Sequence, residues 1–224
     1  MKKRAKLFGA ISFIIVFVIF TLAVKFIDVQ KIGPNGSEVG FATVNDFIHN
    51  VIGVNMTLYL ITDWLGLVPV AFGFGFAVLG LIQLIQRKSL LKVDFDILAL
   101  GVFYIIVISA YLLFEKFAIN YRPIPINGFL EASYPSSTTL LVLCVMATAM
   151  LQLKKRMQKK CARTIILVAI AVFSVFMVVG RLISGVHWLT DIIGSIILSA
   201  ALVLLYHSVC ELYTDRQKMR RANQ

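Results

Sequence analysis

The chain has 224 residues, of which 59% are hydrophobic and only 15% are charged, and its mean hydropathy is +0.89. A soluble domain has about 45–50% apolar and about 25% charged residues, so this composition excludes an ordinary soluble protein. A net charge of +11 can indicate nucleic-acid binding, but here the basic residues lie in short clusters between long apolar runs. Such clusters are typical of membrane topology and not of a basic binding face.

Six mostly apolar runs are long enough to cross a membrane, which takes about 20 helical residues. The predicted spans cover residues 7–24, 65–85, 97–114, 137–153, 164–179 and 188–207. The first run is longer than the apolar core of a usual signal peptide and lacks a small-residue cleavage site, so we interpret it as an uncleaved helix. Residues 25–49 form a polar stretch, and residues 45–62 predict a short interfacial helix that begins at Asn45 or Asp46.

The basic clusters predict the topology. The N-terminus, residues 87–92, residues 154–163 and the C-terminus carry 17 of the 22 lysines and arginines. With six spans these segments fall on one side, which the positive-inside rule makes cytoplasmic, so both termini are expected in the cytoplasm. We expect one domain over residues 1–224, an all-α bundle of six transmembrane helices. The size and character of the chain favour a bacterial inner membrane.

Polar chemistry is concentrated in two loops on the opposite side. His187 and Asp191 are four residues apart at the start of a helix, so they share one face, where the carboxylate can orient the imidazole. Arg122 and Arg181 add planar guanidinium groups that suit phosphate oxygens. Ionisable residues at a membrane boundary are candidate functional groups. The three cysteines have no spacing that suggests a metal site or a disulfide.

A further candidate anion site lies at the start of the fourth predicted span. Ser136 and Ser137 precede an apolar run, where the free backbone N–H groups and the helix dipole favour an anion. Serines in this place are also common helix caps, and the two roles are compatible.

These residues resemble the type-2 phosphatidic acid phosphatase (PAP2) superfamily, whose pattern is K-x6-R-P, then P-S-G-H, then S-R-x5-H-x3-D. The third part matches in identity and spacing, and the other two match in part. The matching residues are Arg181, His187 and Asp191 for the third part, Arg122 and Pro123 for the first, and Pro135 and Ser136 for the second. The motif region covers about residues 115–194, and the six-span layout extends the resemblance over most of the chain.

The resemblance implies a lipid phosphatase that works at the outer surface with neither metal nor cofactor. His187 would be the nucleophile that forms a phosphohistidine, and Asp191 its orienting partner. Water would be the acceptor in the second step. The phosphoryl oxygens would be held by Arg122, Arg181, Ser136 and Ser137, with Lys116 as a further candidate. The implied partners are a lipid phosphate or diphosphate and the membrane lipids, without nucleic acid.

The sequence departs from the family pattern at three positions. Gly180 replaces the opening serine of the third part. Glu115 stands where the lysine of the first part is expected, and Lys116 comes one position late, a rotation of about 100° on a helix. Thr138 replaces the histidine that protonates the leaving group, and a threonine hydroxyl is a poor proton donor near neutral pH. We therefore place Thr138 among the catalytic positions, with a changed role.

Thr138 leaves several functions open. A lipid diphosphate, such as a polyprenyl diphosphate, needs little protonation because its leaving group is itself a phosphate. His49 in the outer loop is another possible proton source. The alternatives to a phosphatase are a catalytically silent protein that binds lipid phosphate, a lipid phosphotransferase, and a small transporter. The transporter ranks last because its ionisable groups are expected near the bilayer midplane, and these spans are nearly free of charge.

Overall fold

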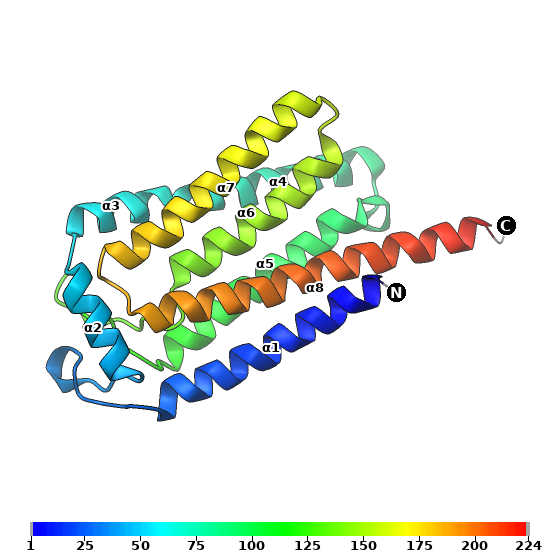
Figure 1. Cartoon of the computed structure of the whole chain (residues 1–224). Coiled ribbons are helices and arrows are strands. Elements are labelled where there is room, and N and C mark those ends of the chain that lie inside the picture. Colours follow the sequence, from blue (N-terminus) through cyan, green and yellow to red (C-terminus); the bar gives the residue numbers. More distant parts are fainter. Residues whose placement is uncertain (1, 223–224) are drawn as a thin grey trace.

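A computed structural model describes residues 2–222 (Figure 1). This part of the chain is helical and contains no β-strand. Its α-helices are α1 (Lys2–Phe26), α2 (Ala42–Ile52), α3 (Met56–Leu65), α4 (Leu67–Arg87), α5 (Phe95–Lys116), α6 (Ser137–Arg156), α7 (Lys160–Ile183) and α8 (Leu189–Ala222). Two short 3-10 turns, η1 (Pro34–Gly36) and η2 (Leu90–Lys92), lie in the connections.

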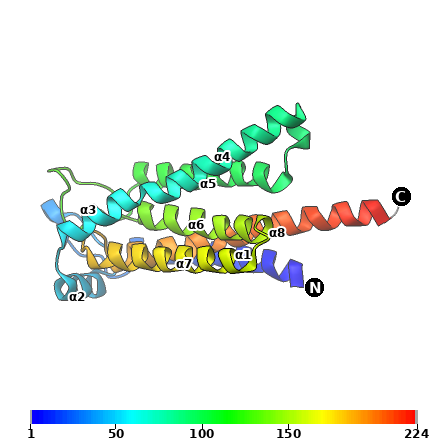
Figure 2. The ribbon, with the colours of Figure 1, turned by 90° about the horizontal axis from the view of Figure 1, so that it is seen from above.

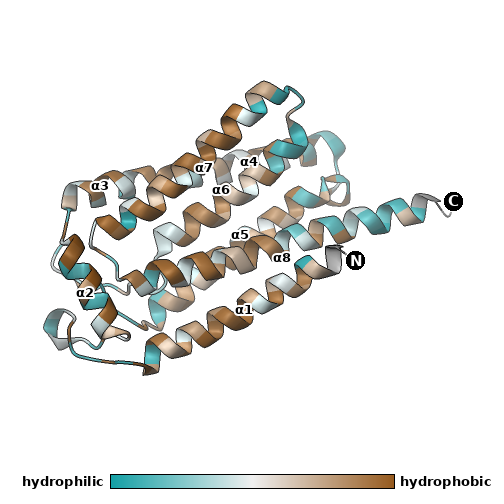
Figure 3. Cartoon of the chain, viewed as in Figure 1, coloured by the Kyte–Doolittle hydropathy of each residue, from teal (hydrophilic) through white to brown (hydrophobic). Residues whose placement is uncertain are grey.

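Six helical segments are long and apolar enough to cross a membrane, which confirms the predicted fold class. They are Ala5–Phe26, Met56–Arg87, Phe95–Lys116, Ser137–Arg156, Lys160–Ile183 and Leu189–Arg220. Figure 3 shows hydrophobic residues along the middle of the bundle and hydrophilic residues at its two ends. Large apolar side chains such as Ile19, Phe74 and Val172 are more than half exposed, which suits a surface that faces lipid.

The second span begins earlier than the sequence predicts. The expected interfacial helix of residues 45–62 is two helices, α2 and α3, separated at Gly53, whose φ of 68° is left-handed. Asn55 caps α3 by accepting a hydrogen bond from Leu58 N at 2.9 Å. The segment from Met56 then continues through Gly66, which is itself in a right-handed helical conformation, into α4. Only α2, which begins at Ala42 rather than at residue 45, stands apart from the spans.

The last helix is longer than its apolar run. The predicted span ends at residue 207, whereas α8 continues to Ala222. Its polar extension still packs beside α1, where Lys6 Nζ lies 2.7 Å from Glu211 Oε1. Helical periodicity therefore continues after hydrophobicity stops, because the extension has a neighbouring helix to contact.

The core of the bundle lies around α6. This helix contacts α4, α5, α7 and α8, and the view from above places it between the α4–α5 pair and α7 (Figure 2). The α8 helix packs along α1. Phe17 of α1, Phe103 of α5, Leu140 of α6 and Leu202 of α8 belong to one buried apolar cluster, which also contains Tyr134 from the loop before α6.

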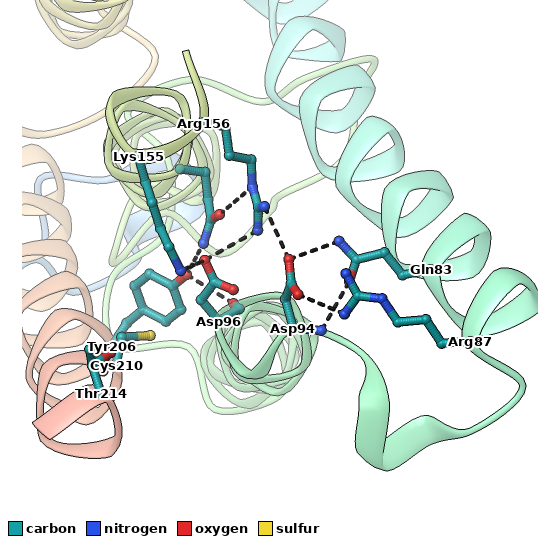
Figure 4. Close-up of polar contacts among 10 residues, drawn as sticks. Gln83, Arg87, Asp94, Asp96, Lys155, Arg156, Tyr206, Cys210 and Thr214 are labelled. Carbon is teal, nitrogen blue, oxygen red and sulfur yellow. Dashed lines mark hydrogen bonds and ion pairs between the residues drawn. The ribbon is translucent and has the colours of Figure 1, made fainter. Parts of the chain in front are cut away.

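One end of the bundle, which we call the basic end, contains both described chain ends and the connections around residues 88–94 and 157–159 (Figure 1). Figure 4 shows its polar network. Asp94 is held by Gln83 at 2.9 Å, by Arg87 at 2.8 Å and by Arg156 at 3.2 Å. Asp96 is held by Arg156 and Lys155 at 3.2 and 2.8 Å. These contacts join the ends of α4, α5 and α6.

The other end, which we call the motif end, contains α2, the loop of residues 117–136 and the turn of residues 184–188. Asn45 joins α2 to α8, because its Nδ2 donates to Thr190 Oγ1 at 2.9 Å and its Oδ1 accepts from Thr190 N at 3.2 Å. Asn120 Oδ1 accepts from Gly40 N at 3.2 Å and so ties the long loop to the segment before α2. The candidate site lies inside this end.

Candidate active site

The turn between α7 and α8 positions His187. Gly185 has a φ of +69°, and a Cβ built on it would lie 2.0 Å from the carbonyl oxygen of Gly53. Glycine is therefore required both for the left-handed conformation and for the close approach to the α2–α3 link. Asn55 N donates to Ser184 O at 3.0 Å and fastens the same turn to the start of α3.

His187 lies between an arginine and a carboxylate. Its Nε2 is 3.2 Å from Arg181 Nη2, and its Nδ1 is 3.5 Å from Asp191 Oδ2. All three residues are buried. Because a guanidinium only donates, Nε2 faces Arg181 as the acceptor and Nδ1 directs its proton toward Asp191. His187 and Asp191, the predicted pair, thus lie in one line with Arg181.

The start of α8 fixes the orientation of the Asp191 carboxylate. Trp188 N donates to Asp191 Oδ2 at 2.9 Å, and Trp188 Nε1 donates to Tyr121 O at 2.7 Å. Asn120 and Ser133 of the long loop also face the Asp191 carboxylate. The carboxylate is thereby held from the α8 side, and the two loop residues face it from the other side.

Burial and two nearby positive charges favour the neutral form of the His187 imidazole. Burial is the main cause that lowers the pKa of His187 well below its ordinary value, and the positive charges of Arg122 and Arg181 lower it further. A neutral imidazole keeps a lone pair on Nε2, which a nucleophile needs. The arginines that suit a phosphate therefore also keep this histidine reactive.

Arg181 enters the site from the last turn of α7. Its guanidinium lies 5.0 Å from the ring centroid of Tyr59, and its Nη1 is 3.7 Å from Asp63 Oδ1, too far for a hydrogen bond. Within the described part of the chain, Nε and Nη1 have no hydrogen-bond partner although both are buried. Buried guanidinium donors without partners are suited to an anion.

Arg122 enters from the long loop. Its backbone N donates to Glu131 O at 3.0 Å, and its Nε lies 3.0 Å from Glu131 Oε2. Its Nη1 is buried and has no hydrogen-bond partner among residues 2–222. Arg122 is close enough to act electrostatically on both Arg181 and His187, so the two predicted arginines share one site.

Ser136 joins the start of α6 to the start of α8. Its backbone N donates to Asp191 O at 3.2 Å, and its carbonyl accepts from Ser195 Oγ at 2.9 Å. Its hydroxyl donates to Thr139 Oγ1 at 3.0 Å. Ser136 therefore lies beside Asp191, with its hydroxyl engaged inside α6.

Ser137 and Thr138 form the first turn of α6 and are half-buried. Thr138 lies next to the α3–α4 junction, because its Cγ2 would be 3.7 Å from a Cβ placed on Gly66. The same Cβ would lie 2.8 Å from the carbonyl oxygen of Asp63. The position that holds a histidine in the family pattern is thus adjacent to the end of α3.

Lys116 is a predicted site residue that the structure does not bring to the others. It lies exposed at the end of α5, with its Nζ 5.7 Å from the ring centroid of Phe117. Sequence reasoning in turn missed the partners of the arginines, Tyr59, Asp63 and Glu131. Only the presence of acidic residues near the motifs signals them in the sequence. Within residues 2–222 no three His, Cys, Asp or Glu side chains gather as a metal site requires.

Comparison with known proteins identifies the family. Residues 104–213 match the sequence profile of the PAP2 superfamily. No curated protein matches the chain significantly. The crystal structure of the first transmembrane PAP2 type phosphatidylglycerolphosphate phosphatase from Bacillus subtilis has the same fold, with a TM-score of 0.55, 17% sequence identity, and coverage of 92% of this chain and 96% of that chain. The chain is a multi-pass membrane protein that belongs to the PAP2 superfamily.

Proposed function

We propose that this protein is a lipid phosphatase that hydrolyses a lipid phosphate or diphosphate at the extracytoplasmic face of a cell membrane through a phosphohistidine. The observation that carries the proposal is the line from Arg181 through His187 to Asp191, at 3.2 and 3.5 Å. A buried neutral imidazole beside buried guanidinium donors suits attack on phosphorus. The family match and the shared fold support phosphatase chemistry in general.

In the first step His187 Nε2 attacks the phosphorus atom. The bond from phosphorus to the leaving oxygen breaks, and the imidazolium that forms keeps its Nδ1 proton directed at Asp191. Arg181 and Arg122 supply donors for the oxygens that gain negative charge. Donors fixed in a buried site account for much of the rate enhancement of such reactions.

In the second step water attacks the phosphohistidine. The bond from nitrogen to phosphorus breaks, phosphate leaves, and His187 returns to its neutral form. The residues of the site perform both steps with neither metal nor cofactor. A lipid alcohol in place of water would give a phosphotransferase.

The charge distribution supports the proposed side of the membrane. Of the 22 lysines and arginines, 17 lie in the segments of the basic end, which the positive-inside rule places in the cytoplasm together with both termini. The motif end then faces outward. The bacterial inner membrane is the membrane we propose.

The test measures phosphate release by detergent-purified protein from a polyprenyl diphosphate and from phosphatidic acid. We expect release from at least one lipid and loss of at least about 1,000-fold in His187→Ala. The control is Cys161→Ser, an exposed change in the α6–α7 region that leaves the site intact. Release that survives His187→Ala would contradict the proposal.

Thr138 favours a second candidate, a silent protein that binds lipid phosphate without turnover. In that case the arginines would hold the phosphate while the leaving group stays unprotonated. Binding of phosphatidic acid vesicles without phosphate release, lost in Arg181→Gln, would support this candidate.

A further inference from the structure

The site lacks a histidine at the position where the family pattern places its proton donor. Thr138 occupies that position, and an alkoxide leaving group needs a proton as its bond to phosphorus breaks. Two carboxyl groups lie beside the arginines of the site, those of Asp63 and Glu131. Their positions differ in ways that decide which of them can reach a leaving group.

Asp63 is held at the site by the packing of α3 on α7. Thr62 is fully buried, and its Cγ2 would be 2.8 Å from a Cβ on Gly180, so the two helices are in close contact there. Tyr59 and Asp63 lie one turn apart on α3 and both face Arg181. Gly180, which departs from the serine of the family pattern, is the residue that permits this approach.

The end of α3, which carries Asp63, also lies beside the position of the missing histidine. Gly66 follows it by one helical turn and has Thr138 as its neighbour from α6. The Asp63 side chain is 55% exposed and its Oδ1 is 3.7 Å from Arg181 Nη1. The carboxyl group is therefore near the phosphate donors without being locked to them by a hydrogen bond.

We propose that Asp63 is the general acid of this enzyme and takes the role that Thr138 lacks. The inference rests on the proposed phosphatase function. As His187 Nε2 bonds to phosphorus, the Asp63 carboxyl group gives its proton to the leaving oxygen, which departs as the lipid alcohol. The Asp63 carboxylate then takes a proton from the water that attacks the phosphohistidine, so the carboxyl group and the neutral imidazole are both restored.

The charged groups that face Asp63 agree with this cycle. Arg181 on α7 is its ion-pair partner, and Tyr59 on α3 lies over the same guanidinium. A bound phosphate competes with Asp63 for Arg181 and brings further negative charge. The phosphate thereby frees the Asp63 carboxyl group from Arg181, so that it can approach the leaving oxygen.

Glu131 and His49 are weaker candidates. Glu131 Oε2 lies 3.0 Å from Arg122 Nε, and the Glu131 carbonyl accepts from Arg122 N, so this residue is bound to its arginine along the loop. His49 on α2 packs against Trp188, with ring centroids 5.4 Å apart. Burial lowers the pKa of His49, which makes it a poor donor of a proton near neutral pH.

The test compares Asp63→Asn with wild type on two leaving groups. Phosphatidic acid has an alkoxide leaving group that needs a proton, and p-nitrophenyl phosphate has a phenolate that departs without one. We expect Asp63→Asn to lower kcat by about 100-fold or more for phosphatidic acid and only a few-fold for p-nitrophenyl phosphate. The matched control is Glu131→Gln, which removes the carboxylate from the other arginine and should affect both substrates equally.

A second variant restores the missing group. Asp63→Asn combined with Thr138→His should regain at least about 10-fold of the lost activity on phosphatidic acid, because the histidine occupies the neighbouring position. Equal losses on both substrates in Asp63→Asn, or no loss, would overturn the role of Asp63 while phosphate release dependent on His187 leaves the proposed function standing. A wild type that releases no phosphate from phosphatidic acid overturns the role of Asp63, and one that releases none from a polyprenyl diphosphate either overturns the proposed function as well.

Discussion

The charged groups at the two ends of the bundle differ in their hydrogen-bond partners. At the basic end, Asp94 has three side-chain partners and Asp96 has two, all at 2.8 to 3.2 Å (Figure 4). At the motif end, buried nitrogens of Arg122 and Arg181 have no hydrogen-bond partner within the described residues. Asp191 Oδ1 is buried without a partner there as well.

The difference in hydrogen-bond partners suggests different roles for the two ends. A buried polar group without a partner costs roughly 1–3 kcal/mol, so folding alone does not explain the motif end. At the motif end Arg181 contacts one histidine and Arg122 acts on it electrostatically, whereas the donors at the basic end join three helices. We infer that the basic end is built for stability and the motif end for a phosphate.

Removing one arginine from each end tests the difference between the two ends most strongly. Arg181→Gln should lower kcat/KM for the preferred lipid by about 100–1,000-fold, because it removes a donor from the developing oxyanion, and should leave the melting temperature almost unchanged. Arg156→Gln should do the reverse, with near-normal activity and a loss of about 1–3 kcal/mol, because it breaks contacts to both Asp94 and Asp96. Kinetics and thermal unfolding in detergent measure both variants. Equal losses of activity and of stability in the two variants would contradict the different roles of the two ends.

A pair of glycines tests how tightly the motif end is built. Gly185 and Gly36 both have positive φ, but a Cβ on Gly185 meets the Gly53 carbonyl at 2.0 Å whereas one on Gly36 meets nothing within 4 Å. Gly36→Ala should cost about 1 kcal/mol for the left-handed conformation alone. Gly185→Ala should cost about 2–5 kcal/mol, since overpacking adds to that strain, and should also lower activity by moving His187. Equal unfolding temperatures would show that the contact is not tight.

Acid should weaken the basic end of the bundle. The hydrogen bond from Arg87 is the main cause that lowers the pKa of Asp94 below its usual range. Because the folded-state pKa is the lower one, its stabilisation is complete above the unfolded value and is lost as the pH falls through the folded value. The melting temperature of wild type should therefore fall more steeply below about pH 4 than that of Asp94→Asn. Parallel pH profiles for the two proteins would contradict this.

The activity should depend on pH through His187. The lowered pKa of His187 keeps the imidazole neutral below the ordinary histidine value near 6.5. The loss of kcat/KM on acidification should therefore occur below that value. In Arg122→Gln, which removes one of the charges that lower this pKa, the loss should move to higher pH. A pH–rate profile of the two proteins checks the direction, and a shift to lower pH in Arg122→Gln would contradict it.

Much of the fold could be predicted from the sequence because a helix that crosses the lipid needs about 20 mostly apolar residues. Long apolar runs separated by basic clusters gave the six spans, and all six are confirmed. The helix boundaries were predicted less well, since Met56 to Thr62 look amphipathic yet belong to the second span. Neither the break at Gly53 nor the extension of α8 to Ala222 depends on hydrophobicity, so the apolar pattern did not indicate them.

The site was predictable where its residues lie on one helix start. His187 and Asp191 share a face by their spacing alone, and the structure places them 3.5 Å apart. Lys116 was expected beside Arg122, but α5 continues to that lysine and directs it to the exposed surface. Asp63 reaches Arg181 only through the packing of α3 on α7, a contact between segments more than 100 residues apart that no local pattern records.

The proposed function requires that His187 forms a covalent bond to phosphorus at the motif end. The most direct measurement is a rapid alkaline quench of the purified protein with a 32P-labelled lipid phosphate, followed by mass spectrometry of the labelled peptide. We expect label on the peptide that contains His187, stable in alkali and lost in acid, and none in His187→Ala. Phosphate release by wild type without any label on His187, under conditions that trap a histidine phosphate in a known enzyme, would contradict it.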